Sequence, residues 1–294
     1  MSPNQRGSLF MMGSMAAFTL NDSLVKLIGA GMPLPQLIAL RGAIACALIY
    51  ALARRLGALR WDLGRRDWTL VVLRSLSELA IAYFFLTALL VMPLANITAI
   101  LQALPLTVTL GAALIFREPV GWRRLLAILT GFAGVLLIVR PGPEGFSEGT
   151  FFALAAVLCI TARDLITRKI SPGVPSILVA FSAMVAVFLT AAILSLGVEW
   201  TPLDAAGFSL LAGAAVFIFA GFLFSVMAMR AGEIAVISPF RYSGLLWALV
   251  LGWLVFGDWP DALTMLGAAI VVATGMFTLY RERAVSAAAN RART

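Results

Sequence analysis

The chain has 294 residues, of which 62% are hydrophobic and 12% are charged, and its mean hydropathy is +0.99. Because soluble proteins carry about 25% charged residues, this composition excludes a soluble globular protein and any sizeable soluble domain. The net charge of +8 does not indicate a nucleic-acid partner, since the basic residues lie between apolar runs and form no soluble basic face.

The chain contains ten apolar runs, each close to the roughly 20 residues that an α-helix needs to cross a bilayer. Strands of a transmembrane β-barrel would be alternating segments of about ten residues, and these runs are longer and uniformly apolar. The pattern therefore predicts an all-α polytopic membrane protein with ten transmembrane helices. The predicted helices span residues 7–29, 35–54, 68–91, 94–116, 121–140, 149–169, 175–197, 207–230, 234–257 and 262–280.

The basic residues predict the orientation of these helices. If the helices alternate in direction, Arg6 and the arginine clusters that follow helices 2, 4 and 10 fall on one side of the membrane. The other side carries Arg140 against several carboxylates, including Asp258 and Asp261. Since positively charged loops stay in the cytoplasm, we expect a multi-pass protein of the bacterial inner membrane with both termini cytoplasmic.

The two halves of the chain also resemble each other. A shift of 142 residues aligns the beginnings of the halves, and a shift of 140 residues aligns their later parts. Because five helices per half is an odd number, the second half must enter the membrane from the opposite face, as in many secondary transporters. We expect two inverted five-helix repeats, 1–145 and 146–281, followed by a cytoplasmic tail, 282–294. The aligned pairs include Thr19 with Thr161, Asp22 with Asp164, Ala95 with Ala235, and Phe116 with Phe256.

Several motifs in the later part of each half resemble a known family. The first copy contains Pro93-Leu94-Ala95-Asn96-Ile97 and Phe116-Arg117-Glu118-Pro119, and the second contains Ser238-Pro239-Phe240-Arg241-Tyr242 before Phe256-Gly257-Asp258. They resemble the signature of the EamA branch of the drug/metabolite transporter superfamily over nearly the whole chain. Asp258 stands where that family often has glutamate. The resemblance implies a ten-helix 5+5 inverted-repeat fold and export of amino acids or other metabolites, with the aromatic amino acid exporters as the nearest group.

Ionisable side chains inside membrane helices are costly, and they indicate either a function or a specific partner. Arg41 and Arg241 lie well inside predicted helices without an acidic neighbour in the same helix, so each needs a carboxylate of another helix, backbone carbonyls or an anionic substrate. Glu78 follows Arg74 by four residues, a spacing that allows an ion pair on one helix face. A structural ion pair explains this couple as well as a substrate site does.

Two acidic residues at repeat-related positions are candidates for ion coupling. Asp22 precedes Lys26 by four residues and can pair with it. Asp164 adjoins Arg163, but adjacent residues of a helix point to different faces, so we expect these two to need separate partners. Proton coupling could use Asp22, Glu78 or Asp164, and simple facilitated flux fits the sequence equally well.

Aromatic, amide and proline residues complete the candidate site. Phe240 and Trp247 share one face of the ninth predicted helix, Tyr83 lies in the middle of the third, and packing or lipid contact is the alternative to a ligand role. Gln102 and Tyr242 offer uncharged polar contacts. Pro105 and Pro239 lie within helices, where proline removes a backbone hydrogen bond and can bend the helix during gating. The candidate gating and coupling residues are thus Asp22, Asp164, Pro105 and Pro239.

Together these features predict a secondary transporter and not an enzyme. It would export small organic metabolites, foremost aromatic or hydrophobic amino acids, by alternating access through a central cavity. In this hypothesis Arg241 contacts the substrate carboxylate while Phe240 and Trp247 hold its apolar part. The chain has no histidine and no P-loop, so neither a metal nor a cofactor is expected. The expected partners are the substrate and the lipid bilayer, as a monomer or a homodimer. The alternatives are export of other metabolites or cationic drugs, a membrane-embedded enzyme, or a channel.

Overall fold

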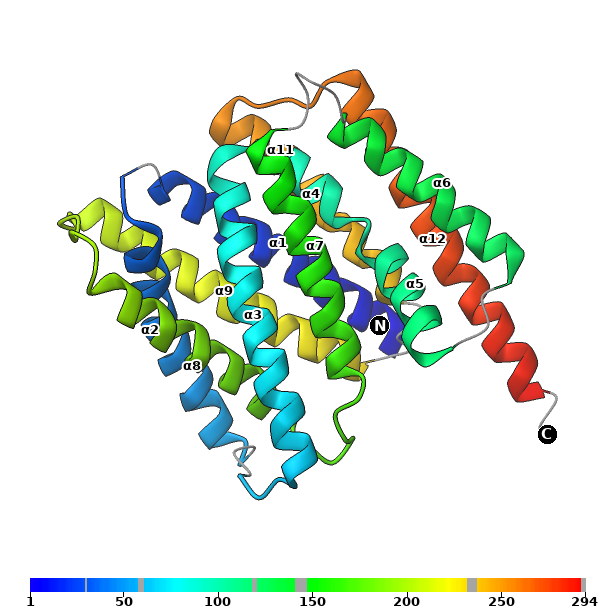
Figure 1. Ribbon diagram of the computed structural model, residues 1–294, viewed down its shortest axis with the longest axis horizontal. Coiled ribbons are helices and arrows are strands. Elements are labelled where there is room, and N and C mark those ends of the chain that lie inside the picture. The colour runs from blue at the N-terminus through cyan, green and yellow to red at the C-terminus, as the bar shows by residue number, and fades with distance from the viewer. Residues whose placement is uncertain (30, 58–60, 118–120, 141–146, 232–236, 292–294) are drawn as a thin grey trace. The chain divides into compact units, whose positions relative to one another are not determined.

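A computed structural model of the chain describes residues 1–29, 31–57, 61–117, 121–140, 147–231 and 237–291 (Figure 1). All the regular secondary structure in these ranges is helical. The helices are α1 (Pro3–Gly29), α2 (Leu34–Arg55), α3 (Arg65–Val91), α4 (Leu94–Leu101), α5 (Leu104–Phe116), α6 (Trp122–Val139), α7 (Glu148–Thr167), α8 (Ser176–Ser195), α9 (Ala205–Ala231), the 3₁₀-helix η1 (Ser238–Tyr242), α11 (Ser243–Phe256) and α12 (Ala262–Arg291).

A helix lies over each of the ten apolar runs, but α1, over the run 7–29, is not among those apolar enough to cross a membrane, and the number of crossings stays a prediction. Within the described ranges, seven helical segments are long and apolar enough to cross a membrane, if α4 is joined to α5 and most of η1 to α11. The apolar parts of α6 and α12, Leu125–Val139 and Ala262–Thr278, are shorter. The chain is therefore an all-helical, multi-pass membrane protein, as its composition predicts.

The run 94–116 is not the continuous helix that the sequence predicts. It breaks at Gln102 and Ala103, where the amide of Ala103 donates to the carbonyl of Ile100 at 3.0 Å and the amide of Leu106 donates to Ala103 at 2.9 Å. Pro105 explains the break, because it has no N–H to donate and its ring clashes with the preceding turn. The proline therefore lies in the first turn of a new helix, where it is tolerated.

The run 234–257 is also interrupted, although its first residues, 234–236, lie outside the described ranges. After Ile237 the chain forms η1, which holds Pro239 in its first turn, and the α-helix α11 begins at Ser243. With the 140-residue shift, Tyr242 corresponds to Gln102. In each half an α-helix therefore begins next to this repeat-related position, at Leu104 after Gln102 and at Ser243 after Tyr242. The proline follows the position in the first half and precedes it in the second.

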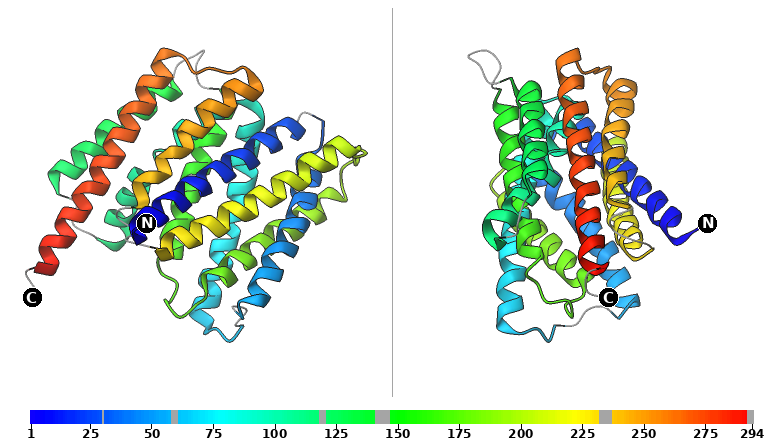
Figure 2. Two further views of the ribbon diagram at one scale, coloured as in Figure 1. Left: turned by 180° about the vertical axis from the view of Figure 1, so that it is seen from behind. Right: turned by 90° about the vertical axis from the view of Figure 1, so that its right-hand side faces the viewer.

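The helices form two compact units, and each unit contains segments of both sequence halves. The first unit comprises Met1–Thr19, Met92–Thr150 and Gly221–Thr294, and the second comprises Leu20–Val91 and Phe151–Ala220. In the first unit α6 packs along α12 and α4 packs against α11; in the second, α8 packs against α2 and α3. The side-by-side course of α6 and α12 is visible in Figures 1 and 2.

Helices at equivalent positions of the two halves pack on each other. The pair α6 and α12 is related by the 140-residue shift, and the pair α2 and α8 by the 142-residue shift. Contact between equivalent, antiparallel helices is what a two-fold axis between inverted repeats would produce. The repeat-related threonines are also alike, since Thr19 and Thr161 each donate to the carbonyl four residues earlier at 2.8 Å.

An ion pair and a helix cap join the end of α6 to the start of α12. Arg140, which ends α6 in the left-handed conformation (φ 49°), pairs with Asp261. Asp261 also caps α12, because its carboxylate accepts from the backbone N–H of Thr264 at 2.8 Å. That hydrogen bond and the nearby Arg140 hold the pKa of Asp261 below its usual value. The two residues thus fix the antiparallel register of the helix pair.

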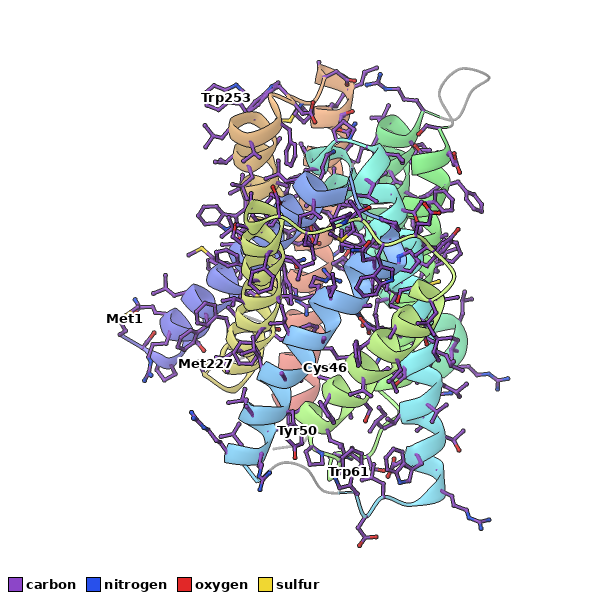
Figure 3. The ribbon with its side chains drawn as sticks, turned by 90° about the vertical axis from the view of Figure 1, so that its left-hand side faces the viewer. Met1, Cys46, Tyr50, Trp61, Met227 and Trp253 are labelled. Atoms are coloured by element: carbon purple, nitrogen blue, oxygen red, sulfur yellow. The ribbon has the colours of Figure 1, made fainter. Side chains whose placement is uncertain are left out.

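Aromatic side chains gather where α2 ends and α3 begins, in the second unit (Figure 3). Tyr50 and Trp61 both lie against Phe181, with ring centroids 5.9 and 6.4 Å apart, and Trp61 stacks on Trp68 at 6.1 Å. Tryptophan and tyrosine are enriched where membrane helices meet water. This aromatic cluster therefore indicates a membrane–water boundary at this end of α2.

Gln36 holds the start of α2 to the connection before α9. Its side chain is 1% exposed, donates to the carbonyl of Thr201 at 2.8 Å and accepts from the amide of Thr201 at 2.9 Å. Replacing Gln36 by leucine leaves both backbone groups of the half-buried Thr201 without this partner, and because water reaches them in part we expect a total cost of about 1 to 3 kcal/mol. We expect a clear fall in the melting temperature of the purified protein. The exposed Gln5→Leu is the matched control, and equal melting temperatures of the two variants would contradict the prediction.

Candidate functional site

Four charged side chains of α3 and α7 form a continuous network in the second unit. Arg74 Nη1 lies 3.7 Å from Glu78 Oε2, and Glu78 Oε1 lies 3.5 Å from Arg163 Nη1. Arg163 in turn donates to Asp164 Oδ1, at 2.9 Å from Nε and 2.8 Å from Nη2. The network carries two positive and two negative charges, so it has no net charge. Its side chains are 12–33% exposed, which places them in a half-buried setting.

The contact between Arg163 and Asp164 differs from the sequence-based expectation that the two residues need separate partners. The guanidinium reaches back along the helix to the adjacent carboxylate, because the arginine side chain is long and its donors form a planar fork. The same guanidinium also reaches Glu78 of α3. Arg163 therefore joins two of the candidate residues, Glu78 and Asp164, in one network.

Arg74 extends the network to two further elements. Its Nε donates to Thr167 Oγ1 of α7 at 3.2 Å, and its Nη1 lies 3.5 Å from the carbonyl of Val179 in α8. Glu78 Oε2, by contrast, is buried and accepts no hydrogen bond in the part of the chain that the structure describes. This oxygen can accept a hydrogen bond or a proton, so Glu78 is the member of the network with unused capacity.

An aromatic cluster continues the same seam between α3 and α7. The rings of Tyr83 and Phe84 lie 5.4 Å apart, and each is 6.1 Å from Phe152 of α7. Tyr83 is 54% exposed, so one face of the cluster is accessible. From Glu78 to Tyr83 along α3, and from Arg163 to Phe152 along α7, the seam passes from charged to aromatic side chains. We call the charged network and these three rings the α3–α7 seam.

A second polar cluster joins α1 to α2 in the second unit. Asn21 donates to Asp22 Oδ1 at 2.9 Å and accepts from Arg41 Nη1 at 3.2 Å. Asn21 and Arg41 are only 2% and 9% exposed. The amide therefore bridges a cation and a carboxylate. Arg41 bonds to a side-chain amide of another helix, and not to one of the partners predicted for it, a carboxylate, a backbone carbonyl or an anionic substrate. At the equivalent position of the other half, Asp164 likewise accepts from the residue before it, Arg163.

The remaining candidates belong to the first unit. Gln102 and Tyr242 are buried at the two helix breaks, and the Tyr242 hydroxyl makes no hydrogen bond within the described residues. Arg241 was predicted to lie well inside a continuous helix. It lies instead in the short 3₁₀-helix η1, and it is exposed. Gly275 of α12 gives the Tyr242 ring its space, since a Cβ there would collide with the hydroxyl. The side chain of Tyr242, the last residue of η1, thus packs against α12 at Gly275.

Phe240 and Trp247 lie in two different helical elements, η1 and α11, and not on one continuous α-helix as predicted. They are 36% and 40% exposed, and no ring contact joins them in the described part of the chain. Because η1 is a 3₁₀-helix with 3.0 residues per turn instead of 3.6, the spacing that defines one face of an α-helix does not run unbroken from Phe240 to Trp247. Gly244, which lies between the two in the sequence, faces Met15 of α1.

The model of the EamA-like transporter family matches this chain twice, over residues 5–140 and again over residues 147–280. The chain belongs to the EamA-like transporter family. The double match also agrees with the internal repeat found in the sequence, since one copy of the model covers each half. The relatives described next are named as transporters, which is consistent with the prediction of a protein that is not an enzyme.

The EamA-like chain is similar along most of its length to proteins of known transport function. It is 28% identical to a riboflavin transporter of Vibrio cholerae, with 94% of each chain covered. It is 26% identical to the pseudopaline exporter of Pseudomonas aeruginosa, with 89% of this chain and 92% of the exporter covered. It is 22% identical to an S-adenosylmethionine uptake transporter of Rickettsia prowazekii, over 65% of each chain. This membrane protein is accordingly a transporter of small molecules.

A protein of known crystal structure has the same fold as this EamA-like chain. It superposes with a TM-score of 0.67, covering 94% of this chain and 98% of its own, at 17% sequence identity. An identity this low supports the fold alone. The assignment of the fold therefore rests on structure and sequence together.

Sequence reasoning missed three members of the polar and aromatic clusters. Asn21 is not ionisable and so carries no cost in the membrane that would single it out, although it directly precedes Asp22 and bridges to Arg41. Thr167 and Phe152 were missed because nothing in the sequence of α7 reveals which of its residues face α3. The spacing of Phe152, Arg163 and Thr167 does indicate that the three share one face of α7, because they are separated by nearly whole turns of a helix.

Proposed function

We propose that this chain is a secondary transporter of a small aromatic or heteroaromatic metabolite that carries no net charge. The observation that carries the proposal is the α3–α7 seam, in which an accessible aromatic cluster adjoins a neutral network of two cations and two anions. A neutral network suits an uncharged or zwitterionic substrate, because a net charge on the substrate would remain uncompensated in a low-dielectric site.

Riboflavin is the first candidate substrate. It is uncharged, it combines a planar heteroaromatic ring with a hydroxylated chain, and relatives from Vibrio cholerae and Rhizobium johnstonii that match 94% of this chain are named riboflavin transporters. In the proposed complex the flavin ring stacks on Tyr83 and the hydroxyl groups bind the charged network. Glu78 Oε2 is the acceptor in this network that is left unused.

Aromatic amino acids are the second candidate, as the sequence resemblance implies. Their ammonium and carboxylate groups would need one anion and one cation of the network, and Glu78 and Arg74 lie within 3.7 Å of each other. Arg241, Phe240 and Trp247 remain proposed contributors from the first unit. Gln102 and Tyr242 of the first unit, and Arg41 of the second, are each proposed as polar substrate contacts within their own unit.

Transport assays in proteoliposomes separate these candidates. Counterflow of labelled riboflavin and of labelled phenylalanine is measured on the same preparation, with the other compound as competitor. Tyr83→Ala should raise the KM of the true substrate by about 2- to 10-fold, since an aromatic contact contributes about 0.5 to 1.5 kcal/mol, and should leave the maximal rate nearly unchanged. Tyr280→Ala, at a position that is 67% exposed, is the control. Counterflow of neither compound would contradict the substrate class.

We further propose that Glu78 couples transport to protons, and that Asp22 and Asp164 contribute to this proton coupling. Glu78→Gln should then make uptake insensitive to an imposed pH gradient while equilibrium exchange continues. An unchanged response to the gradient would contradict this role. Facilitated flux without coupling is the alternative, and it predicts no gradient dependence in the unmodified protein. The relatives include both uptake and export systems, and we propose export for this chain.

Finally, we propose alternating access between two inverted five-helix halves, 1–145 and 146–281, with the tail 282–294 and both termini in the cytoplasm of a bacterial inner membrane. The helix breaks next to Pro105 and Pro239 support a gating role for these prolines. Reporter fusions at each connection test the orientation. Unchanged transport rates after replacing both prolines by alanine would contradict the gating role.

A further inference from the structure

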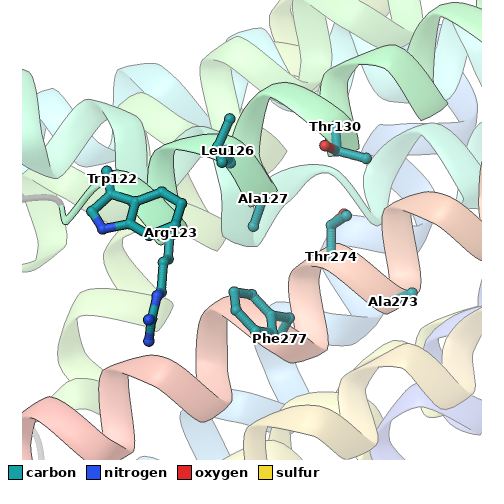
Figure 4. Close-up of a pocket in the computed structure, with 8 residues that line it drawn as sticks. All are labelled: Trp122, Arg123, Leu126, Ala127, Thr130, Ala273, Thr274 and Phe277. Carbon is teal, nitrogen blue, oxygen red and sulfur yellow. The ribbon is translucent and has the colours of Figure 1, made fainter.

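A groove opens between α6 and α12 on the surface of the first unit (Figure 4). Its volume is about 490 Å³, and its walls are formed by Leu126, Ala127 and Thr130 of α6 and by Ala273, Thr274 and Phe277 of α12. Trp122 and Arg123 stand at one end of it, at the first turn of α6. None of these residues belongs to the α3–α7 seam, so the groove is a separate feature of the molecule.

The groove exists because the two halves differ at equivalent positions. On one side of the helix crossing, Gly134 and Gly267 bring the backbones together, so that a Cβ on Gly267 would stand 2.5 Å from the carbonyl oxygen of Gly134. With the 140-residue shift, the equivalent pair on the other side is Ala127 and Thr274, and both line the groove. Side chains here prevent the close approach that two glycines allow, so the helix pair stays open at this end.

The walls of the groove are apolar and accessible. Leu126 is 53% exposed and Phe277 is 42% exposed. The Thr274 hydroxyl donates to the carbonyl of Ile270 at 2.8 Å, so it is satisfied within its own helix and leaves the wall apolar to a ligand. On the apolar face of a membrane helix, such a surface meets hydrocarbon chains. The groove therefore suits an acyl chain.

The end of the groove is positively charged. The Arg123 guanidinium lies over the Trp122 ring, 5.3 Å from its centroid, and no carboxylate pairs with it in the described residues. Leu263 takes the place of Arg123 in the other half, so the charge marks only this end of the helix pair. Tryptophan and arginine are typical of the level of the lipid headgroups. In the orientation proposed above this end faces the cytoplasmic leaflet, which carries anionic lipids.

We propose that the groove binds one anionic phospholipid of the bilayer, with an acyl chain between α6 and α12 and the phosphate on Arg123. Charge complementarity decides between the possible occupants, because the unpaired guanidinium needs an anion and the apolar walls need a hydrocarbon chain. A phospholipid supplies both in one molecule. A second copy of this chain would have to present a carboxylate beside an apolar helix ridge to do the same.

The test uses the full-length protein, purified in detergent and stripped of lipid. Binding of dioleoylphosphatidylglycerol and of dioleoylphosphatidylcholine is measured by native mass spectrometry, with glycerol 3-phosphate as the free-anion probe. Arg123→Gln should weaken phosphatidylglycerol binding by about fivefold, the effect of one basic residue near an anionic headgroup, and should leave phosphatidylcholine binding unchanged. Ala273→Trp, which fills the groove from an exposed position, should weaken binding of both lipids.

Two matched variants serve as controls. Arg55→Gln removes an exposed charge at the end of α2, and Leu266→Trp adds a ring at an exposed position of α12 outside the groove. Both should bind lipid like the unmodified protein. Equal binding of the two lipids by the unmodified protein would overturn the proposal. Binding of glycerol 3-phosphate as tight as that of the lipid would also overturn it, and so would a dimer that Ala273→Trp dissociates.

Discussion

Replacing Arg163 by glutamine is expected to reduce transport at least about tenfold and to lower the melting temperature of the protein. Arg163 is the cation between Glu78, at 3.5 Å, and Asp164, at 2.8 Å. Without it, two half-buried carboxylates share only Arg74. Removing one partner of a buried pair costs about 3 to 5 kcal/mol, and because these side chains are 20–33% exposed we expect about 1 to 3 kcal/mol here.

A double variant separates stability from transport in this network. Arg163→Gln combined with Asp164→Asn restores the charge balance, so it should recover most of the lost stability. If the network binds substrate or protons, the double variant should still transport poorly. Transport is measured in proteoliposomes and normalised to the monodisperse fraction of each preparation. Normal transport by Arg163→Gln would show that the network is only structural and would remove the basis of the proposed site.

The positions of the helices could be predicted from the sequence because membrane crossing imposes a simple length rule. A run of about 20 apolar residues is needed whatever the helix packs against, and each of the ten runs contains a helix. The interruption near Gln102 also follows from a local cause, since Pro105 lacks an N–H. The corresponding position in the second half, Tyr242, is harder to predict from the sequence, because Pro239 precedes it and occupies the first turn of a 3₁₀-helix.

The partners of the polar side chains could not be predicted, because they depend on the rotation and packing of whole helices. The sequence identifies Glu78 and Asp164 as costly residues in a membrane, but only the structure shows that Arg163 joins them. Arg41 finds an amide on α1 instead of the carboxylate that its charge alone would suggest. The residue types were therefore accessible from the sequence, while the network they form was not.

The strongest effect on folding is expected from Gly267→Ala, a change of one methyl group. The added Cβ would stand 2.5 Å from the carbonyl oxygen of Gly134 and 2.8 Å from Ile138 Cγ1. A backbone carbonyl inside a helix cannot move alone, so α6 and α12 would have to separate along the register fixed by Arg140 and Asp261. Overpacking typically costs about 1 to 3 kcal/mol, and we expect the upper end of this range, seen as a large fall in the melting temperature.

A graded series of glycines tests whether close backbone approach is the cause. Gly173→Ala should leave the melting temperature nearly unchanged, because no atom lies within 4 Å of its Cβ position. Gly131→Ala should have an intermediate effect, since the Cβ would meet the ends of the Leu106 and Thr274 side chains, which can rotate away. Gly267→Ala should be the least stable of the three. If Gly131→Ala proves as damaging as Gly267→Ala, the helix pair is held by side-chain packing along its length, and the glycine contact does not set how closely α6 and α12 approach.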